Sequence, residues 1–227
     1  MIVSIHQPNY LPYLGIFHKM LRSDVFVLYD TAQFSKNDFH NRNRIKTPKG
    51  PRWLTVPVRS PGKKAIRDVE IDDSVPWAKK HAQTLEANYA RASHFDAHWP
   101  TISHLLPKPW AKLCDLNIRF LEELRAWLNL RAELVRGSTL GVPPELSPTE
   151  KLVYMVRAVG GTAYLSGPGG RDYLVPKAFG DVRLVFDEFR HPVYPQLFGP
   201  FEPNLSVIDA VLNCGASETR RLLDRAS

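Results

Sequence analysis

The first 30 residues constrain the fold of this chain more than any other segment. Ile2–Ile5 is a short, mostly β-branched run, and Pro8 and Pro12 prevent it from extending, because proline cannot donate to a sheet. Apolar residues then recur at helical spacing over residues 13–21, and Val25–Tyr29 is continuously apolar. Such a strand is typical of a parallel sheet covered on both faces. The sequence therefore predicts a βαβ-like unit in a Rossmann-like α/β fold, with a mostly parallel sheet flanked by helices.

The rest of the chain supplies further strands and one well-defined helix start. Trp53–Val56, Ala163–Leu165 and Val182–Phe186 read as strands, and Ile66–Ile71 as a weaker edge strand. Ser147–Glu150 has the pattern of a capping box with proline at the first helical position, which predicts a helix from there to the glycine pair that follows Val159.

The middle of the chain is helical by its spacing. Apolar residues recur at three- and four-residue steps through residues 74–130, and prolines divide the segment into three helices. We expect this segment to be a helical cap or insertion within a single domain of residues 1–227, because a chain of this length can bury one sizeable core.

The charge of the chain is positive and locally concentrated. Thirty Lys and Arg residues against 23 Asp and Glu residues give a net charge of +7. The basic residues are densest between Lys36 and Lys64, where Asp38 is the single acid. A nucleic-acid surface, a pocket for a nucleotide or sugar phosphate, and plain solvated lysines all agree with this pattern. Nucleic acid is the least favoured, because no recognised binding module accompanies the charge.

Other features bear on the cellular compartment. No uncharged apolar run reaches the length of a membrane span, and the N-terminal residues lack the pattern of a signal peptide. Cys114 and Cys214 lie far apart, in neither a CxxC pair nor a metal-binding cluster. We therefore expect a cytoplasmic protein without a membrane span, a bound metal or a cofactor.

His6 and Asp30 are the candidate catalytic residues. Each follows a predicted parallel strand, and ligands of open α/β sheets bind at the carboxyl ends of the strands. A histidine there suits acid–base chemistry, and a neighbouring carboxylate could orient it. The alternative is a structural hydrogen bond that joins two loops.

Further residues are candidates for binding substrate. Residues 31–50 have no assignable period, and a long irregular stretch within a compact domain suggests a functional loop. Its arginines and amides suit a carboxylate or phosphate group. The glycine-rich stretch after Ala163–Leu165 and the proline-rich stretch after residue 190 also fit pocket walls, or else simple chain connections. The substrate-binding candidates are Gln7, Asn9, Tyr10, Gln33, Lys36, Asn41, Arg42, Arg44, Ser166, Gly167, Tyr194 and Gln196.

These residues resemble the pattern of the WbqC-like proteins of bacteria. The matching blocks are His6–Gly15, the strand from Asp24 to Asp30, Gln33–Lys36, Asn41–Ile45, Trp53–Pro57, Tyr164–Gly167, Tyr173–Leu174, His191–Gln196 and Pro203–Asp209. The resemblance implies an enzyme of surface-glycan, O-antigen or specialised-metabolite biosynthesis. It further implies the transfer of an acyl or aminoacyl group to an amine such as that of an amino sugar.

Two alternative functions remain open. The first βαβ unit is also similar to the nucleotide-binding half of pantothenate-synthetase-like adenylate-forming enzymes, although the second histidine of their signature has no clear equivalent beyond the nearby His18. This similarity implies a nucleotide-dependent enzyme. The other alternative is a non-catalytic module that binds nucleic acid or a partner protein.

For the favoured interpretation as an enzyme, the expected partner is a small anionic substrate or an acyl donor, either free or attached to a carrier protein.

Overall fold

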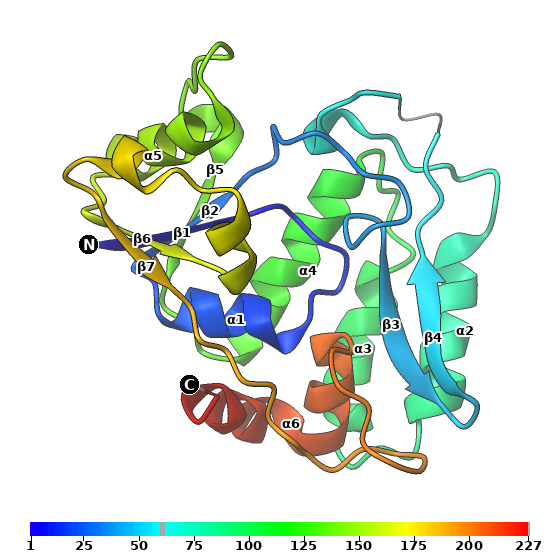
Figure 1. The fold of residues 1–227 in the computed structure, drawn as a ribbon. Helices are drawn as coiled ribbons and strands as arrows, with labels where there is room; N and C mark the ends of the chain where they lie inside the picture. Colours follow the sequence, from blue (N-terminus) through cyan, green and yellow to red (C-terminus); the bar gives the residue numbers. More distant parts are fainter. Residues whose placement is uncertain (60–61, 227) are drawn as a thin grey trace.

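The computed structural model describes residues 1–59 and 62–226, and its parallel sheet lies in the left half of the view in Figure 1. The sheet has five strands in the order β5–β2–β1–β6–β7, and every neighbouring pair in it is parallel. The strands are β1 (Ile2–His6), β2 (Val25–Leu28), β5 (Glu133–Arg136), β6 (Ala163–Ser166) and β7 (Arg183–Phe186). The structure thus confirms a mixed α/β fold with a mostly parallel sheet.

Helices cover both faces of the sheet, as the uninterrupted apolar strands predict. Val25 and Val27 of β2 pack in a cluster with α5 (Pro148–Ala158), whereas Phe26 and Leu28 pack in a second cluster with α1 (Leu14–Leu21) and α4 (Leu113–Trp127). Alternate residues of a strand point to opposite faces, so each face of β2 meets its own helical layer. The last helix, α6 (Val207–Asp224), contacts α1.

A hairpin separate from the five-stranded sheet replaces much of the expected irregular loop. Arg42–Thr47 forms β3 and Gly50–Thr55 forms β4, and the two strands pair antiparallel with Arg44 opposite Trp53. The expectation of an irregular stretch through residue 50 was therefore wrong for β3. The buried residues of this strand include asparagine and lysine as well as Ile45, so hydrophobic alternation does not reveal it.

The predicted three-helix count in the middle of the chain is confirmed. The helices are α2 (Trp77–Tyr89), α3 (Phe95–Leu105) and α4. Helix α4 shares a hydrophobic cluster with the sheet, and α2 contacts β3. The description of this segment as a cap or insertion, and of the chain as a single domain, stays a prediction.

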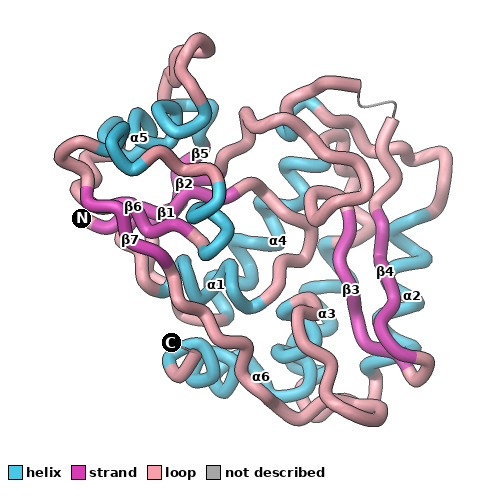
Figure 2. The backbone as a smooth tube through the Cα atoms, in the orientation of Figure 1, coloured by secondary structure: helices cyan, strands magenta, loops and turns pink. Residues whose placement is uncertain are grey.

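Short helical turns complete the backbone (Figure 2). The capping box at the start of α5 is present, since Ser147 and Glu150 exchange both of its hydrogen bonds. Ile66–Asp68 is a 3-10 turn (η1) rather than a strand, and further turns are η2 (Gly137–Thr139), η3 (Pro168–Asp172) and η4 (Pro176–Phe179). Within α6, Gly215 has a φ of 80° and divides two helical runs.

Within residues 1–59 and 62–226, no helix combines the length and apolar character that a membrane crossing requires.

Candidate functional site

A cavity of about 540 Å³ lies at the carboxyl ends of β1 and β6. We call it the His6 cavity. Its walls come from the end of β1, from α1, from the start of the loop after β2 and from the segment after β6, and they include His6, Gln7, Tyr13, Lys19, Tyr29, Tyr164, Ser166, Gly167, Gly170 and Tyr173. The strand order reverses between β1 and β6, because the chain builds outward from β1 in one direction and then in the other. In open α/β sheets, ligands bind in the crevice at this reversal.

His6 is held as a neutral imidazole with one free nitrogen. Its Nδ1 lies 2.8 Å from the carbonyl oxygen of Gln7. A carbonyl only accepts, so Nδ1 carries the proton and Nε2 is left as an acceptor. Within the described residues Nε2 has no hydrogen-bond partner. Burial, followed by the positive charge of Lys19, lowers the pKa of His6 to about 3, so the ring stays neutral at physiological pH.

Lys19 places a cation in the same cavity. The side chain comes from α1 and is 5% exposed. Its Nζ donates to the carbonyl oxygen of Ile5 at 2.9 Å, one residue before His6. Burial lowers the pKa of Lys19 to about 8, although the charge of Asp187 opposes this effect. The amine is therefore mainly protonated near pH 7 and keeps further N–H groups for a ligand.

His40 fixes the orientation of the Gln7 side chain. The Nδ1 atom of His40 accepts a hydrogen bond from the backbone N–H of Ser35 at 3.0 Å, so Nε2 of the neutral ring carries the proton. That Nε2 donates to Oε1 of Gln7, also at 3.0 Å. Burial lowers the pKa of His40, which favours the neutral ring. The side-chain oxygen of Gln7 thus already accepts a hydrogen bond, and the side-chain NH₂ group remains as a donor at the His6 cavity.

Tyrosines and the glycine-rich segment form the remaining walls. Burial raises the pKa of Tyr13, Tyr29 and Tyr164, so these phenols stay protonated and can donate. Ser166 donates to the carbonyl oxygen of Gly167 at 3.1 Å. A side chain at Gly170 would collide with Ser166, so glycine is required for this close approach. The cavity thus combines hydroxyl donors, one cation and one free imidazole acceptor.

Among the described residues, no hydrogen bond joins Asp30 to His6. Both of its oxygens accept from Ser138, at 2.8 Å from the backbone N–H and 2.6 Å from the hydroxyl. Asp30 is 1% exposed and ties η2 to the end of β2. His18 does have a carboxylate partner, because its Nδ1 lies 2.9 Å from Asp187.

The predicted anion-binding residues of the 31–46 segment divide into buried and surface groups. Asn43 donates to the carbonyl oxygens of Tyr10 and Leu11, and Asn41 donates to that of Val56, so both amides hold backbone. Arg42 and Arg44 lie over the ring of Trp53, at 4.1 and 5.8 Å from its centroid. Gln33 and Lys36 are exposed, and neither lines the His6 cavity.

The other candidates lie away from the His6 cavity. Tyr10 and Asn9 are both buried in the loop after β1, and the Tyr10 hydroxyl lies 2.9 Å from Nδ1 of His81. Tyr194 and Gln196 both donate to Asp209, at 2.9 and 2.8 Å. Of the predicted substrate contacts, the structure therefore brings only Gln7, Ser166 and Gly167 together with His6.

The comparisons with known proteins agree with the sequence pattern. The model of the WbqC-like protein family matches residues 7–221. The chain belongs to the WbqC-like protein family. A relative from Mycobacterium tuberculosis, the uncharacterized protein Rv1507c, is 36% identical over 221 residues, which is 94% of each chain. The family match begins at Gln7 and spans nearly all the residues that surround the His6 cavity.

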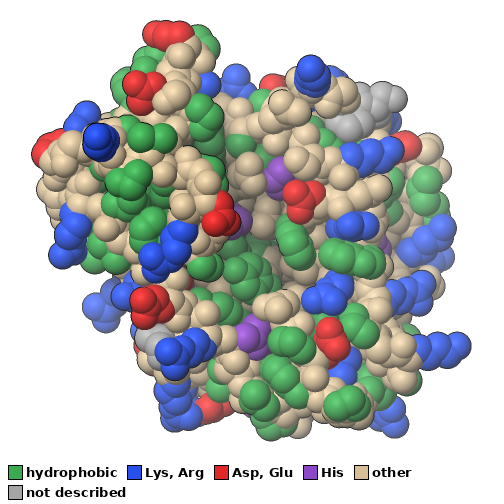
Figure 3. Space-filling model, viewed as in Figure 1, with side chains coloured by type: hydrophobic (Ala, Val, Ile, Leu, Met, Phe, Trp, Pro, Cys, Tyr) green, Lys and Arg blue, Asp and Glu red, His purple; other side chains and the backbone are tan. Residues whose placement is uncertain are grey.

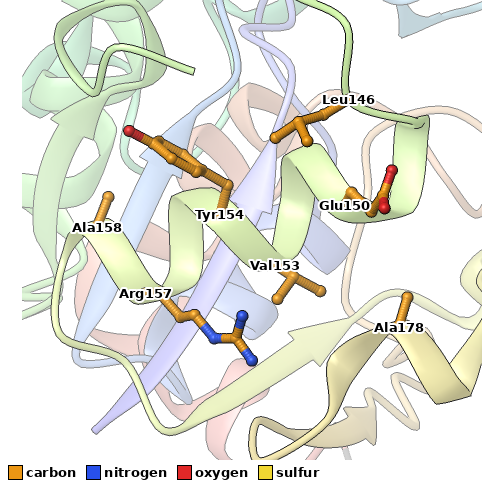
Figure 4. Close-up of a pocket in the computed structure, with 7 residues that line it drawn as sticks. All are labelled: Leu146, Glu150, Val153, Tyr154, Arg157, Ala158 and Ala178. Carbon is orange, nitrogen blue, oxygen red and sulfur yellow. The ribbon is translucent and has the colours of Figure 1, made fainter. Parts of the chain in front are cut away.

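Another depression on this WbqC-like protein lacks comparable chemistry. A groove of about 580 Å³ follows the outer side of α5 and reaches Ala178 of η4 (Figure 4). Its charged groups have local partners: Glu150 caps α5, and Arg157 lies 2.5 Å from Asp181. Nothing in its lining resembles the free imidazole and buried lysine of the His6 cavity. Among the described residues, no group of three or more His, Cys, Asp or Glu side chains is arranged to hold a metal ion.

Sequence reasoning missed the tyrosine walls of the cavity and two residues that set its charge and geometry, Lys19 and His40. Lys19 lies within a helix whose apolar neighbours give no sign that a lysine is buried among them. His40 lies in the segment without a recognisable period, and only the fold brings it to Gln7. The spacing of the sequence carries no signal for either residue, because it does not distinguish a buried lysine of a helix from a solvated one.

Proposed function

We propose that this protein transfers an acyl or aminoacyl group from an activated ester or thioester to the amine of a small biosynthetic acceptor, such as an amino sugar. The observation that carries the proposal is the state of His6. The ring is neutral, its Nδ1 proton is held by the Gln7 carbonyl, and its Nε2 lone pair is free in a cavity of about 540 Å³. A fixed tautomer with a free ring nitrogen facing a cavity is the geometry that a general base needs, and the role also requires the bound substrate to raise the pKa of His6.

The proposed reaction assigns a step to each residue. His6 takes the proton from the attacking amine as the C–N bond forms, and then returns a proton to the leaving oxygen or sulfur as the acyl bond breaks. Lys19 stabilises the negative charge that develops on the carbonyl oxygen, and the Gln7 amide helps to orient the substrate. A negatively charged substrate would favour the imidazolium form of His6, and so raise its pKa from about 3 towards the working pH.

The basic side of the molecule supports an anionic donor. Figure 3 shows Lys and Arg side chains over the part that carries β3, β4 and α2. Trp53 and Phe39 are each 40% exposed there, and Arg42 stacks on the Trp53 ring. Exposed aromatic and guanidinium groups are favourable for binding other molecules. We propose this side as the contact for the anionic part of the donor or for its carrier protein.

The test begins with a thermal-shift screen against acyl and aminoacyl thioesters, nucleotides and nucleotide-linked amino sugars. Hits are then combined in pairs, and products are detected by mass spectrometry. We expect His6→Asn to lower kcat at least about a hundredfold, because asparagine can keep the donor to Gln7 but has no equivalent of Nε2. The matched control is His104→Asn, since His104 is exposed on α3. Full activity of a folded His6→Asn protein would refute the assignment.

A second candidate function is a nucleotide-dependent reaction. It is favoured by the strand order, whose reversal between β1 and β6 is the pattern of Rossmann-like nucleotide-binding sheets, and by the glycine-rich segment that lines the crevice. We propose the Rossmann-like relationship on this ground. If it is right, millimolar ATP with Mg²⁺ should raise the melting temperature, since a ligand at about a hundred times its Kd stabilises by about 2.7 kcal/mol. An unchanged melting temperature would count against this candidate.

A further inference from the structure

A second cavity lies beside the His6 cavity, at the carboxyl ends of β2 and β5. Its volume is about 320 Å³, and we call it the Arg67 cavity. Tyr29 lines both cavities. The walls of the Arg67 cavity include Thr31, Arg67, Gly137, Ser138 and Lys151.

Two cations from different elements face this cavity. Arg67 comes from η1, whose backbone is fixed to the end of β2 by the hydrogen bond from Arg67 N–H to the Asp30 carbonyl oxygen at 2.9 Å. Lys151 comes from the first turns of α5 and has no ion-pair partner among the described residues. Arg67 pairs with Asp68 at 3.8 Å, and both side chains are about half exposed, so this pair is weak.

The acids near the Arg67 cavity are already engaged. The two side-chain oxygens of Asp30 accept from Ser138, and the Glu150 carboxylate is used in the capping box of α5. The Ser138 hydroxyl donates to Asp30, so towards a ligand it can only accept. The Thr31 hydroxyl has no partner in the described part of the chain and can donate. None of the lining residues is acidic.

We propose that the Arg67 cavity binds a phosphoryl group of the substrate, while the reacting end of the same substrate occupies the His6 cavity. The forked guanidinium of Arg67, the amine of Lys151 and the hydroxyl of Thr31 together suit a multiply charged phosphate. A single carboxylate, with one negative charge and two oxygens, would not use all of these donors. The shared Tyr29 wall places the two parts of the ligand side by side. The substrate class is therefore a phosphorylated molecule, such as a nucleotide-activated sugar. The placement of the reacting end rests on the proposed function, whereas the phosphoryl site itself does not.

The test measures the binding of sodium pyrophosphate by isothermal titration calorimetry at constant ionic strength. We expect saturable binding to one site. Arg67→Gln and Lys151→Gln should each weaken it at least about tenfold, because each removes a charge-assisted contact. The controls are Arg131→Gln and Lys79→Gln, which remove exposed cations elsewhere and should change the affinity less than about twofold.

Each other outcome overturns the proposal. Without saturable binding there is no such site, and an equal loss in the controls means that general charge attracts the anion. Malonate that binds as tightly as pyrophosphate would refute the phosphoryl assignment in favour of a carboxylate. The His6→Asn protein should keep its pyrophosphate affinity. If it loses that affinity, the anion sits in the His6 cavity instead. Failure of the transferase assay alone leaves this measurement unaffected, so the two proposals are tested separately.

Discussion

Replacing Lys19 with methionine should make the protein more stable and, at the same time, inactive. Methionine has a similar length and no charge. The fall in the Lys19 pKa from 10.5 to about 8 corresponds to about 3 kcal/mol of unfavourable charge burial, at about 1.36 kcal/mol per pH unit. Loss of the hydrogen bond to the Ile5 carbonyl reduces this gain by about 1 kcal/mol. The free energy of unfolding of Lys19→Met should therefore exceed that of the wild type by about 2 kcal/mol at pH 7.

The sign of this effect can be checked by its pH dependence. Between about pH 8 and 10.5 the unfolded chain still binds a proton on Lys19 that the folded chain has released. The free energy of unfolding of the wild type therefore rises with pH in that window, and the excess stability of Lys19→Met over the wild type shrinks. Urea denaturation at pH 7 and at pH 10 measures both values. The reasoning is refuted if Lys19→Met is the less stable protein at pH 7, or if its advantage is the same at both pH values.

Three further predictions concern hydrogen bonds around the site. His40→Ala removes the hydrogen bond that orients the Gln7 side chain, so kcat/KM should fall about ten- to hundredfold. His40→Gln should recover part of this loss. A steady-state assay of both variants measures the two values of kcat/KM. Asp209→Ala leaves the buried hydroxyls of Tyr89 and Tyr194 without an acceptor and removes one acceptor of the half-buried Gln196 amide, so urea denaturation should show a loss of about 3–5 kcal/mol, and a loss below about 1 kcal/mol would contradict it. Asp30→Asn should cost about 1–3 kcal/mol of stability but lower kcat less than about tenfold, because Asp30 holds Ser138; a hundredfold loss of kcat would restore Asp30 to catalysis.

The sequence predicts this fold best where the structure is determined locally. The β1–α1–β2 unit is read correctly because its strands are apolar on both faces and its helix has regular spacing. The capping box at Ser147 is read correctly because its two hydrogen bonds lie within four residues. The sequence alone also places His6 and Ser166 at strand ends, and these ends meet at the His6 cavity.

Elements that depend on distant partners escape the sequence. The β5 strand has only four residues, with Glu133 and Arg136 at its ends, and its pairing with β2 across the sheet defines it. In β3, the buried Asn43 has its hydrogen bonds satisfied by the loop of Tyr10 and Leu11, so a polar residue occupies a core position. Hydrophobic periodicity cannot detect a core built in this way, because the amide is compensated by backbone that lies about 30 residues earlier in the chain.

Buried polar groups in this protein fall into two kinds, and the difference supports the site. Asn43 and Asp209 are buried with partners supplied by the protein itself, so their role is to hold the fold. In the described part of the chain, the side chains of His6 and Lys19 each have one hydrogen-bond partner, and both keep hydrogen-bonding capacity towards the same cavity. Burial of a lysine that is only partly compensated costs stability, and such a cost is expected where a ligand supplies the missing partner. The pKa of both groups is lowered by that burial. The energetic cost therefore lies at the crevice between β1 and β6, and we infer that contacts with the reacting end of the bound substrate offset it.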